Sequence, residues 1–80
     1  MEREEFKRID KYIEDVEENL EQWPDKSVVM ERHLTKLHLV VKRLMHLFKD
    51  TKDQQLKTSL STLEHRARRC IRCIETGHTN

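Results

Sequence analysis

The sequence predicts an all-α protein, folded as an antiparallel three-helix bundle whose helices run up, down and up. Three observations support this fold class. Apolar residues recur every three or four positions, which is the period of a helix whose apolar seam faces another helix. Charged residues make up 39% of the chain and hydrophobic residues 35%, which suits helices with narrow apolar seams and solvated outer faces. The single glycine and the few aromatic residues argue against an all-β domain, which would need turns and β-branched runs.

The apolar rhythm divides into three segments, one for each predicted helix. They are Phe6, Ile9, Ile13, Val16, Leu20, Trp23; then Met30, Leu34, Leu37, Val41, Leu44, Phe48; then Leu56, Leu60, Leu63, Ala67, Cys70, Ile74. Every position is apolar when Cys70 is counted as the small hydrophobe that a cysteine usually is. The length predicts a single domain over residues 1–80. A core this small needs well-fitted packing, a partner chain or both, so a homodimer or a domain-swapped form remains open.

The first helix is predicted over about residues 2–22. Acidic residues in its first turn complement the helix dipole: Glu2, Glu4 and Glu5. Trp23-Pro24 ends the helix, because the residue before a proline is pushed out of the α region. Trp23 keeps the phase of the seam, so we expect it to close one end of the core.

The second helix is predicted over about residues 26–49, with Asp25 or Ser27 as its N-terminal cap. Three further apolar residues widen its apolar arc: Val40, Met45 and Leu47. The widened arc spans about 160° at the helical period, more than a helix with one neighbour needs. We therefore expect the second helix to lie between the other two and to be the most buried.

A short turn is predicted where the seam loses its phase. Residues 49–55 are all polar, and Phe48 is followed by Leu56 only after eight positions. A capping box formed by Thr51 and Gln54 would start the next helix. The absence of glycine and proline here leaves a second possibility, one long continuous helix that would require a dimer or a domain swap.

The third helix is predicted over about residues 52–76, with Gly77 as a C-terminal stop and residues 77–80 as a tail. It carries the strongest functional candidate, a set of arginines that turn away from the seam, with Arg66 on the flank. These are Arg66, Arg68, Arg69 and Arg72, joined by Lys36, Leu39 and Arg43 on the outer face of the second helix. Arginine suits phosphate and carboxylate alike, so an acidic protein, a nucleic acid and a merely solvated face all remain open.

Charge is distributed unevenly along the chain. Residues 1–25 hold ten acidic and four basic residues, and residues 26–80 hold five acidic and twelve basic ones. Either the two parts pack against each other, or the basic part meets an acidic partner or a nucleic acid. The late acids of the first helix form a candidate docking face, with a solvated face as the alternative: Glu14, Glu17, Glu18 and Glu21.

Metal and redox chemistry are weakly supported by the sequence. Cys70 and Cys73 have the spacing of two metal ligands, but a structural zinc site needs four ligands and no second pair follows. The pair lies at a helix C-terminus, where the dipole opposes the thiolate that redox chemistry needs. We interpret both as packing cysteines. The histidines, such as His33 and His38, lack the i,i+4 spacing of a helical metal site, although they could make stability pH-dependent.

No catalytic constellation is present, so we expect neither an enzyme nor a cofactor. The functional hypothesis is a non-catalytic protein–protein interaction or oligomerisation module, built on coiled-coil-like seams and acting inside the cell, in cytoplasm or nucleus. The absence of a signal peptide and of a disulfide framework favours that location. The alternative is a small nucleic-acid-binding or transcription-linked regulatory domain that uses the basic face of the third helix. No apolar run is long enough for a membrane span.

Overall fold

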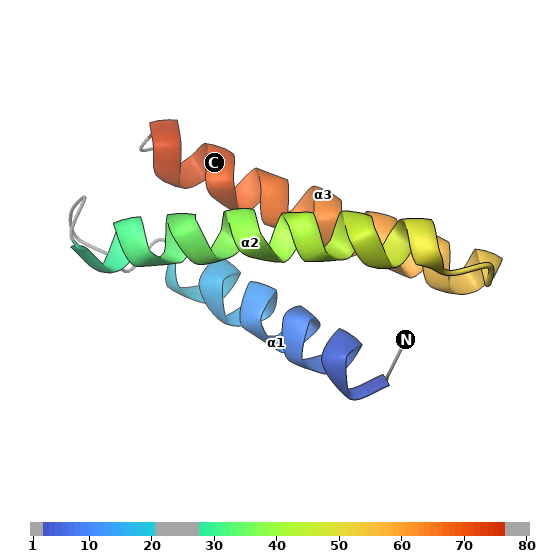
Figure 1. Ribbon diagram of the computed structural model, residues 1–80. Helices are drawn as coiled ribbons and strands as arrows, with labels where there is room; N and C mark the ends of the chain where they lie inside the picture. Colours follow the sequence, from blue (N-terminus) through green and yellow to red (C-terminus); the bar gives the residue numbers. More distant parts are fainter. Residues whose placement is uncertain (1–2, 21–27, 77–80) are drawn as a thin grey trace.

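The computed structural model describes residues 3–20 and 28–76, and it forms three helices: α1 (Arg3–Asn19), α2 (Val28–Asp50) and α3 (Gln54–Thr76). Successive helices run in opposite directions, with α1 on one side of the hairpin that α2 and α3 form (Figure 1). The predicted all-α, up-down-up bundle is confirmed. The expected cap at Asp25 or Ser27 and the place of Trp23 lie outside the described residues.

The turn between α2 and α3 is three residues long, and it fixes these two helices as an antiparallel pair. The side chain of Asp53 caps α3, because its Oδ1 accepts hydrogen bonds from the backbone N–H of Gln55 at 2.9 Å and of Leu56 at 3.4 Å. The short turn is thus confirmed, and the long continuous helix is not formed. The predicted capping box of Thr51 and Gln54 is wrong, since Gln54 is already the first helical residue and Thr51 instead accepts from the N–H of Asp53.

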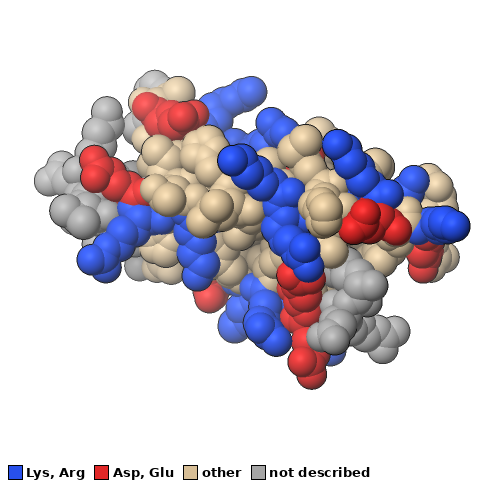
Figure 2. Space-filling model, viewed as in Figure 1, with Lys and Arg blue, Asp and Glu red and all other residues tan. Residues whose placement is uncertain are grey.

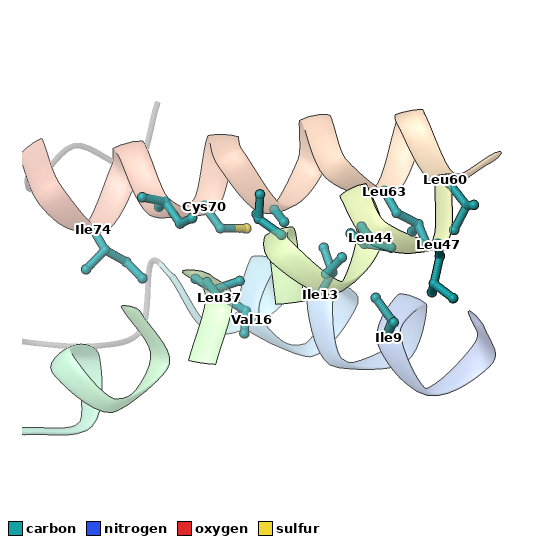
Figure 3. Close-up of a cluster of buried hydrophobic side chains, with 13 residues drawn as sticks. Ile9, Ile13, Val16, Leu37, Leu44, Leu47, Leu60, Leu63, Cys70 and Ile74 are labelled. Carbon is teal, nitrogen blue, oxygen red and sulfur yellow. The ribbon is translucent and has the colours of Figure 1, made fainter. Parts of the chain in front are cut away.

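The core consists of apolar side chains from all three helices, which meet between the ribbons in Figure 3. Its buried members are Ile9, Ile13 and Val16 from α1; Leu37, Val41, Leu44 and Leu47 from α2; and Leu60, Leu63, Ala67, Cys70, Ile71 and Ile74 from α3. Among residues whose burial is described, no polar or charged side chain is buried. Burial of apolar surface is therefore the main force that holds the bundle together.

The helix at the centre of the bundle is α3, and the expectation that the second helix would be the most buried is wrong for the described side chains. Buried residues around α3 extend from Cys73 to Ile71, an arc of about 160°, whereas those of α2 span about 120° and those of α1 about 60°. α3 packs against both other helices. Met45, which was expected to widen the buried arc of α2, is 40% exposed.

Candidate interaction surfaces

Arg66 joins α3 to α1 through two carboxylates. Its Nη2 and Nε donate to the two oxygens of Glu17 at 2.7 and 3.2 Å, and its Nη1 donates to Asp10 at 2.9 Å. These hydrogen bonds raise the pKa of the guanidinium still further, Glu17 contributing most. Arg66 was a candidate for partner binding and Glu17 for an acidic docking face. The structure instead pairs them with each other, half-buried, where α1 and α3 meet.

Arg43 joins α2 to α1 in the same way. Its Nε and Nη2 donate to the two carboxylate oxygens of Glu5 at 2.8 and 3.0 Å, a bidentate pair at the protein surface. The hydrogen bond from Arg43 lowers the pKa of Glu5. A partner that used Arg43 would first have to displace this carboxylate.

Tyr12, His33 and Lys36 form a second polar contact between α1 and α2. The hydroxyl of Tyr12 lies 2.9 Å from Nδ1 of His33, and the Nζ of Lys36 lies 4.4 Å from the centre of the Tyr12 ring. Burial raises the pKa of Tyr12 to about 12 and lowers the pKa of His33, with Lys36 adding to the latter effect. The phenol therefore stays protonated and can donate to a neutral imidazole. Lys36, also a candidate, is directed toward α1.

The acidic docking face predicted on the first helix is divided. Glu14 and Glu18 are exposed, Glu17 is bound by Arg66, and Glu21 lies outside the described residues. Sequence reasoning missed the role of Asp10 as the second partner of Arg66. The sequence did indicate that Arg66 could contact another helix of the same chain. Arg66 lies on the flank of the apolar seam, and residues on a flank face the neighbouring helix of a bundle.

The other three arginines of α3 remain on the surface. Arg68 pairs with Glu64 through Nε at 3.4 Å, and its Nη2 approaches the sulfur of Met45 at 3.7 Å. Arg69 and Arg72 are exposed and form no ion pair with any residue in the described ranges 3–20 and 28–76. These three arginines are therefore the members of the predicted basic face that stay accessible to a partner.

A groove between α2 and α3 was not anticipated from the sequence; we call it the outer groove. Its lining residues are Leu44, Met45, Phe48, Lys49, Leu60, Ser61 and Glu64. Met45 and Phe48 are 40% and 39% exposed, large fractions for such apolar side chains. The Nζ of Lys57 lies 5.3 Å from the centre of the Phe48 ring. The apolar pattern of the sequence predicted that Met45 and Phe48 would be buried in the core. This prediction is wrong, because both side chains are partly exposed to solvent.

The outer groove and α1 lie on opposite sides of the α2–α3 hairpin. On α2, Arg43 binds α1 and Met45 lines the groove; on α3, Arg66 binds α1 and Arg68 contacts Met45. Residues two apart on a helix point about 160° away from each other, which separates the two sides. The structure therefore does not gather all the candidates into one patch. Leu39 is 60% exposed on α2 and does not line the groove.

Basic side chains are spread across the face of the molecule that α2 presents. Figure 2 shows Lys and Arg over the middle of this face, with tan surface between them, while Asp and Glu lie toward its ends and lower edge. α1 contributes acidic residues, and some of them form ion pairs with Arg43 and Arg66. The two parts of the chain pack against each other, which is the first interpretation of the charge asymmetry. That the remaining basic surface meets a partner stays a prediction.

Cys70 and Cys73 are both free thiols and both buried, with exposed fractions of 1% and 8%. In Figure 3 the sulfur of Cys70 points into the cluster of apolar side chains. Burial raises the pKa of Cys70 to about 11, so its thiol stays protonated. Within the described parts of the chain, no three His, Cys, Asp or Glu side chains are grouped as a metal ion would require.

None of the helices in the described ranges combines the length and the apolar character needed to cross a membrane. Searches of protein-family models, of curated proteins and of solved structures give no match for this chain.

Proposed function

We propose that this protein is a non-catalytic protein-interaction module that docks a partner across the outer groove. One observation carries the proposal: Met45 and Phe48 expose apolar surface on the side of the α2–α3 hairpin that α1 leaves open. Exposed apolar patches rimmed by polar residues often mark interaction sites. The two free thiols suit the reducing interior of a cell, where we place the module.

The rim of the groove supports a protein partner. An apolar centre with charged residues around it matches the usual anatomy of protein interfaces, in which a few buried anchors carry most of the binding energy. Lys49 and Lys57 flank Phe48, and Arg68 flanks Met45. The rim can select a partner by charge while the two apolar side chains provide contact area.

Site-specific photo-crosslinking in cells tests the proposal. A photoreactive amino acid replaces Ser61 in the groove or, as the matched control, the exposed Lys11 on α1. We expect Ser61 to give an adduct of discrete mass that Lys11 does not give, and we expect Met45→Glu to abolish it while Leu39→Glu leaves it intact. No adduct from Ser61, or the same adducts from both positions, would overturn the proposal.

If the partner in the groove is a second copy of this chain, the protein acts as an oligomerisation module. Molecular mass measured across protein concentration separates the two forms, because a homo-oligomer gains mass without any other chain. In a dimer that uses the groove, Met45→Glu lowers the mass to that of one chain, and Leu39→Glu does not.

Nucleic-acid binding is the second candidate, and it is favoured by Arg69 and Arg72, which are exposed and form no ion pair with residues 3–20 or 28–76. Its test is a filter-binding titration at several salt concentrations, with Arg68, Arg69 and Arg72 changed together to Glu. Binding that weakens with salt and is lost in the triple variant supports this candidate. Unchanged affinity, or no salt-dependent binding, removes it.

A further inference from the structure

We propose that the partner element is an acidic amphipathic helix, which lies in the outer groove as a fourth helix on the side of the hairpin opposite α1. This inference rests on the proposed function and names the chemistry of its partner. It is drawn from the way the hairpin holds its own first helix.

α1 packs on one side of the α2–α3 hairpin, and its residues show what kind of helix the hairpin binds there. It offers a row of apolar residues at helical spacing, Ile9, Ile13 and Val16, which are buried in the core. Acidic residues flank this row, and they meet arginines of the hairpin: Glu5 pairs with Arg43, and Asp10 and Glu17 pair with Arg66. The hairpin therefore binds an acidic amphipathic helix through an apolar floor and arginines at the edges.

The open side repeats these components. Leu44 and Leu60 form the floor of the outer groove, and Met45 and Phe48 extend it toward solvent. Arg68 lies two positions after Arg66, so the two side chains point to nearly opposite sides of α3. Arg66 faces α1, and Arg68 faces the outer groove. An α-helix fits between two antiparallel helices because its side chains pack into the groove between theirs.

The charges at the groove favour an acidic occupant. Lys49 belongs to the lining, and the ammonium of Lys57 lies over the Phe48 ring. The acid in the lining, Glu64, is paired with Arg68 at 3.4 Å, so these two charges offset each other and the two lysines leave the groove with a net positive charge. A basic helix would meet these cations directly, whereas carboxylates would be attracted to them.

A helix of a different protein fits better than α1 of a second copy. The solvent-facing side of α1 carries bases among its acids, and they pair along the helix: Arg8 with Glu4, and Lys11 with Asp15. The acidic and apolar faces of α1 that would suit the groove are already engaged within its own bundle. A nucleic acid fits less well, because phosphates would gain nothing from the apolar surface of Met45 and Phe48.

The experiment uses the full 80-residue chain and designed peptides of about 18 residues, long enough to form a helix when bound. One peptide carries leucines at helical spacing with glutamates on both flanks, and its control carries lysines in place of the glutamates. Fluorescence anisotropy measures both affinities at low and high salt. We expect the glutamate peptide to bind at least about tenfold more tightly at low salt, with a smaller difference at high salt.

Variants of the chain then locate the binding site. Met45→Glu should weaken the glutamate peptide by at least about tenfold, as loss of a central anchor does, while Leu39→Glu on the same helix should not change it. Arg68→Glu should weaken the glutamate peptide and strengthen the lysine peptide, while Arg8→Glu on α1 should do neither. Tighter binding of the lysine peptide would show that the Arg68→Glu variant is folded, because an unfolded variant would bind neither peptide.

Each remaining result speaks against the inference. Equal binding of the two peptides, or equal loss in Met45→Glu and Leu39→Glu, overturns it. So does a duplex oligonucleotide that competes for the groove more strongly than the glutamate peptide, or a groove already filled by a second copy of the chain. If the Ser61 adduct forms but no acidic peptide binds, the inference fails and the proposed function stands; if neither occurs, both fail.

Discussion

The interface between α2 and α3 differs from the docking of α1 in its chemistry. The α2–α3 hairpin is closed by three residues, and the two helices bury apolar side chains against each other along much of their length. α1 buries three apolar residues and adds polar contacts through Arg43, Arg66 and Tyr12. The difference teaches that one chain can combine a mainly apolar hairpin with a helix whose attachment depends on charge. Salt and pH should therefore act first on α1.

The largest expected effect tests the apolar hairpin. Leu60→Asp places an unpaired carboxylate at a site that is 1% exposed, in contact with the core that all three helices share. The cost, about 4 kcal/mol or more, should unfold the whole chain, and Leu37→Asp should do the same. Circular dichroism measures the loss of helix. A cooperative thermal transition that persists in both variants would show that the hairpin is not the common support of the fold.

Ile13→Ala tests the apolar part of the α1 attachment. Ile13 is fully buried, so the truncation should cost about 2–4 kcal/mol. Hydrogen exchange should show loss of protection concentrated in α1 while the amides of α2 and α3 remain protected. Leu39→Ala at an exposed site is the matched control and should change stability by less than about 0.5 kcal/mol. Equal loss of protection in all three helices would remove the distinction between the regions.

Arg66→Ala tests the charged part of the same attachment. The guanidinium is about one-third exposed and bridges two carboxylates, so its loss should cost about 1–2 kcal/mol at low salt. Urea unfolding at low and high salt should show the difference from the wild type shrinking as salt rises. Arg69→Ala, at an exposed position of the same helix, should have little effect at either salt concentration. A salt-independent cost would mean that Arg66 stabilises by packing alone.

The smallest expected effect concerns pH. Burial lowers the pKa of His33 below the usual 6.5, so the unfolded chain binds this proton more readily than the folded one. Its contribution to stability is complete above pH 6.5 and is lost as pH falls through the lower folded-state pKa. Urea unfolding at about pH 7.5 and about pH 5.5 should show a decline that His33→Gln reduces and His38→Gln, on the exposed side of α2, leaves unchanged. An identical decline in all three proteins would assign it to other groups.

The three helices and their directions could be predicted from the sequence because each rests on local signals. The spacing of Leu56, Leu60 and Leu63 shows a helical seam, and the polar run after Phe48 shows the turn. The width of a buried face could not be predicted, because it depends on where the neighbours lie. Ile71 and Cys73 are buried on α3, whereas Met45 is exposed, and nothing in the local pattern distinguishes these residues.

The candidate site was predicted only in part, for a related reason. Arg68, Arg69 and Arg72 were correctly placed on the surface of the third helix. Arg66 and Arg43 have the same side chain, yet their carboxylate partners lie 38 or more positions away along the chain. Such pairings follow from the packing of whole helices, so a charged residue on a helix flank cannot be assigned to a partner protein until the bundle is known.

The two cysteines have a further consequence for experiment. They are the chain's complete set of thiols, both lie in the core, and burial holds the pKa of Cys70 far above neutral. A thiol reagent in solution reaches Cys70 only when the surrounding helices separate, so its labelling rate reports how often the core opens. The unmodified chain thus contains its own kinetic probe of opening, with no engineered label required. Binding of a partner in the outer groove, which lies on the opposite side of the hairpin from α1, would then be detected as slower labelling of Cys70.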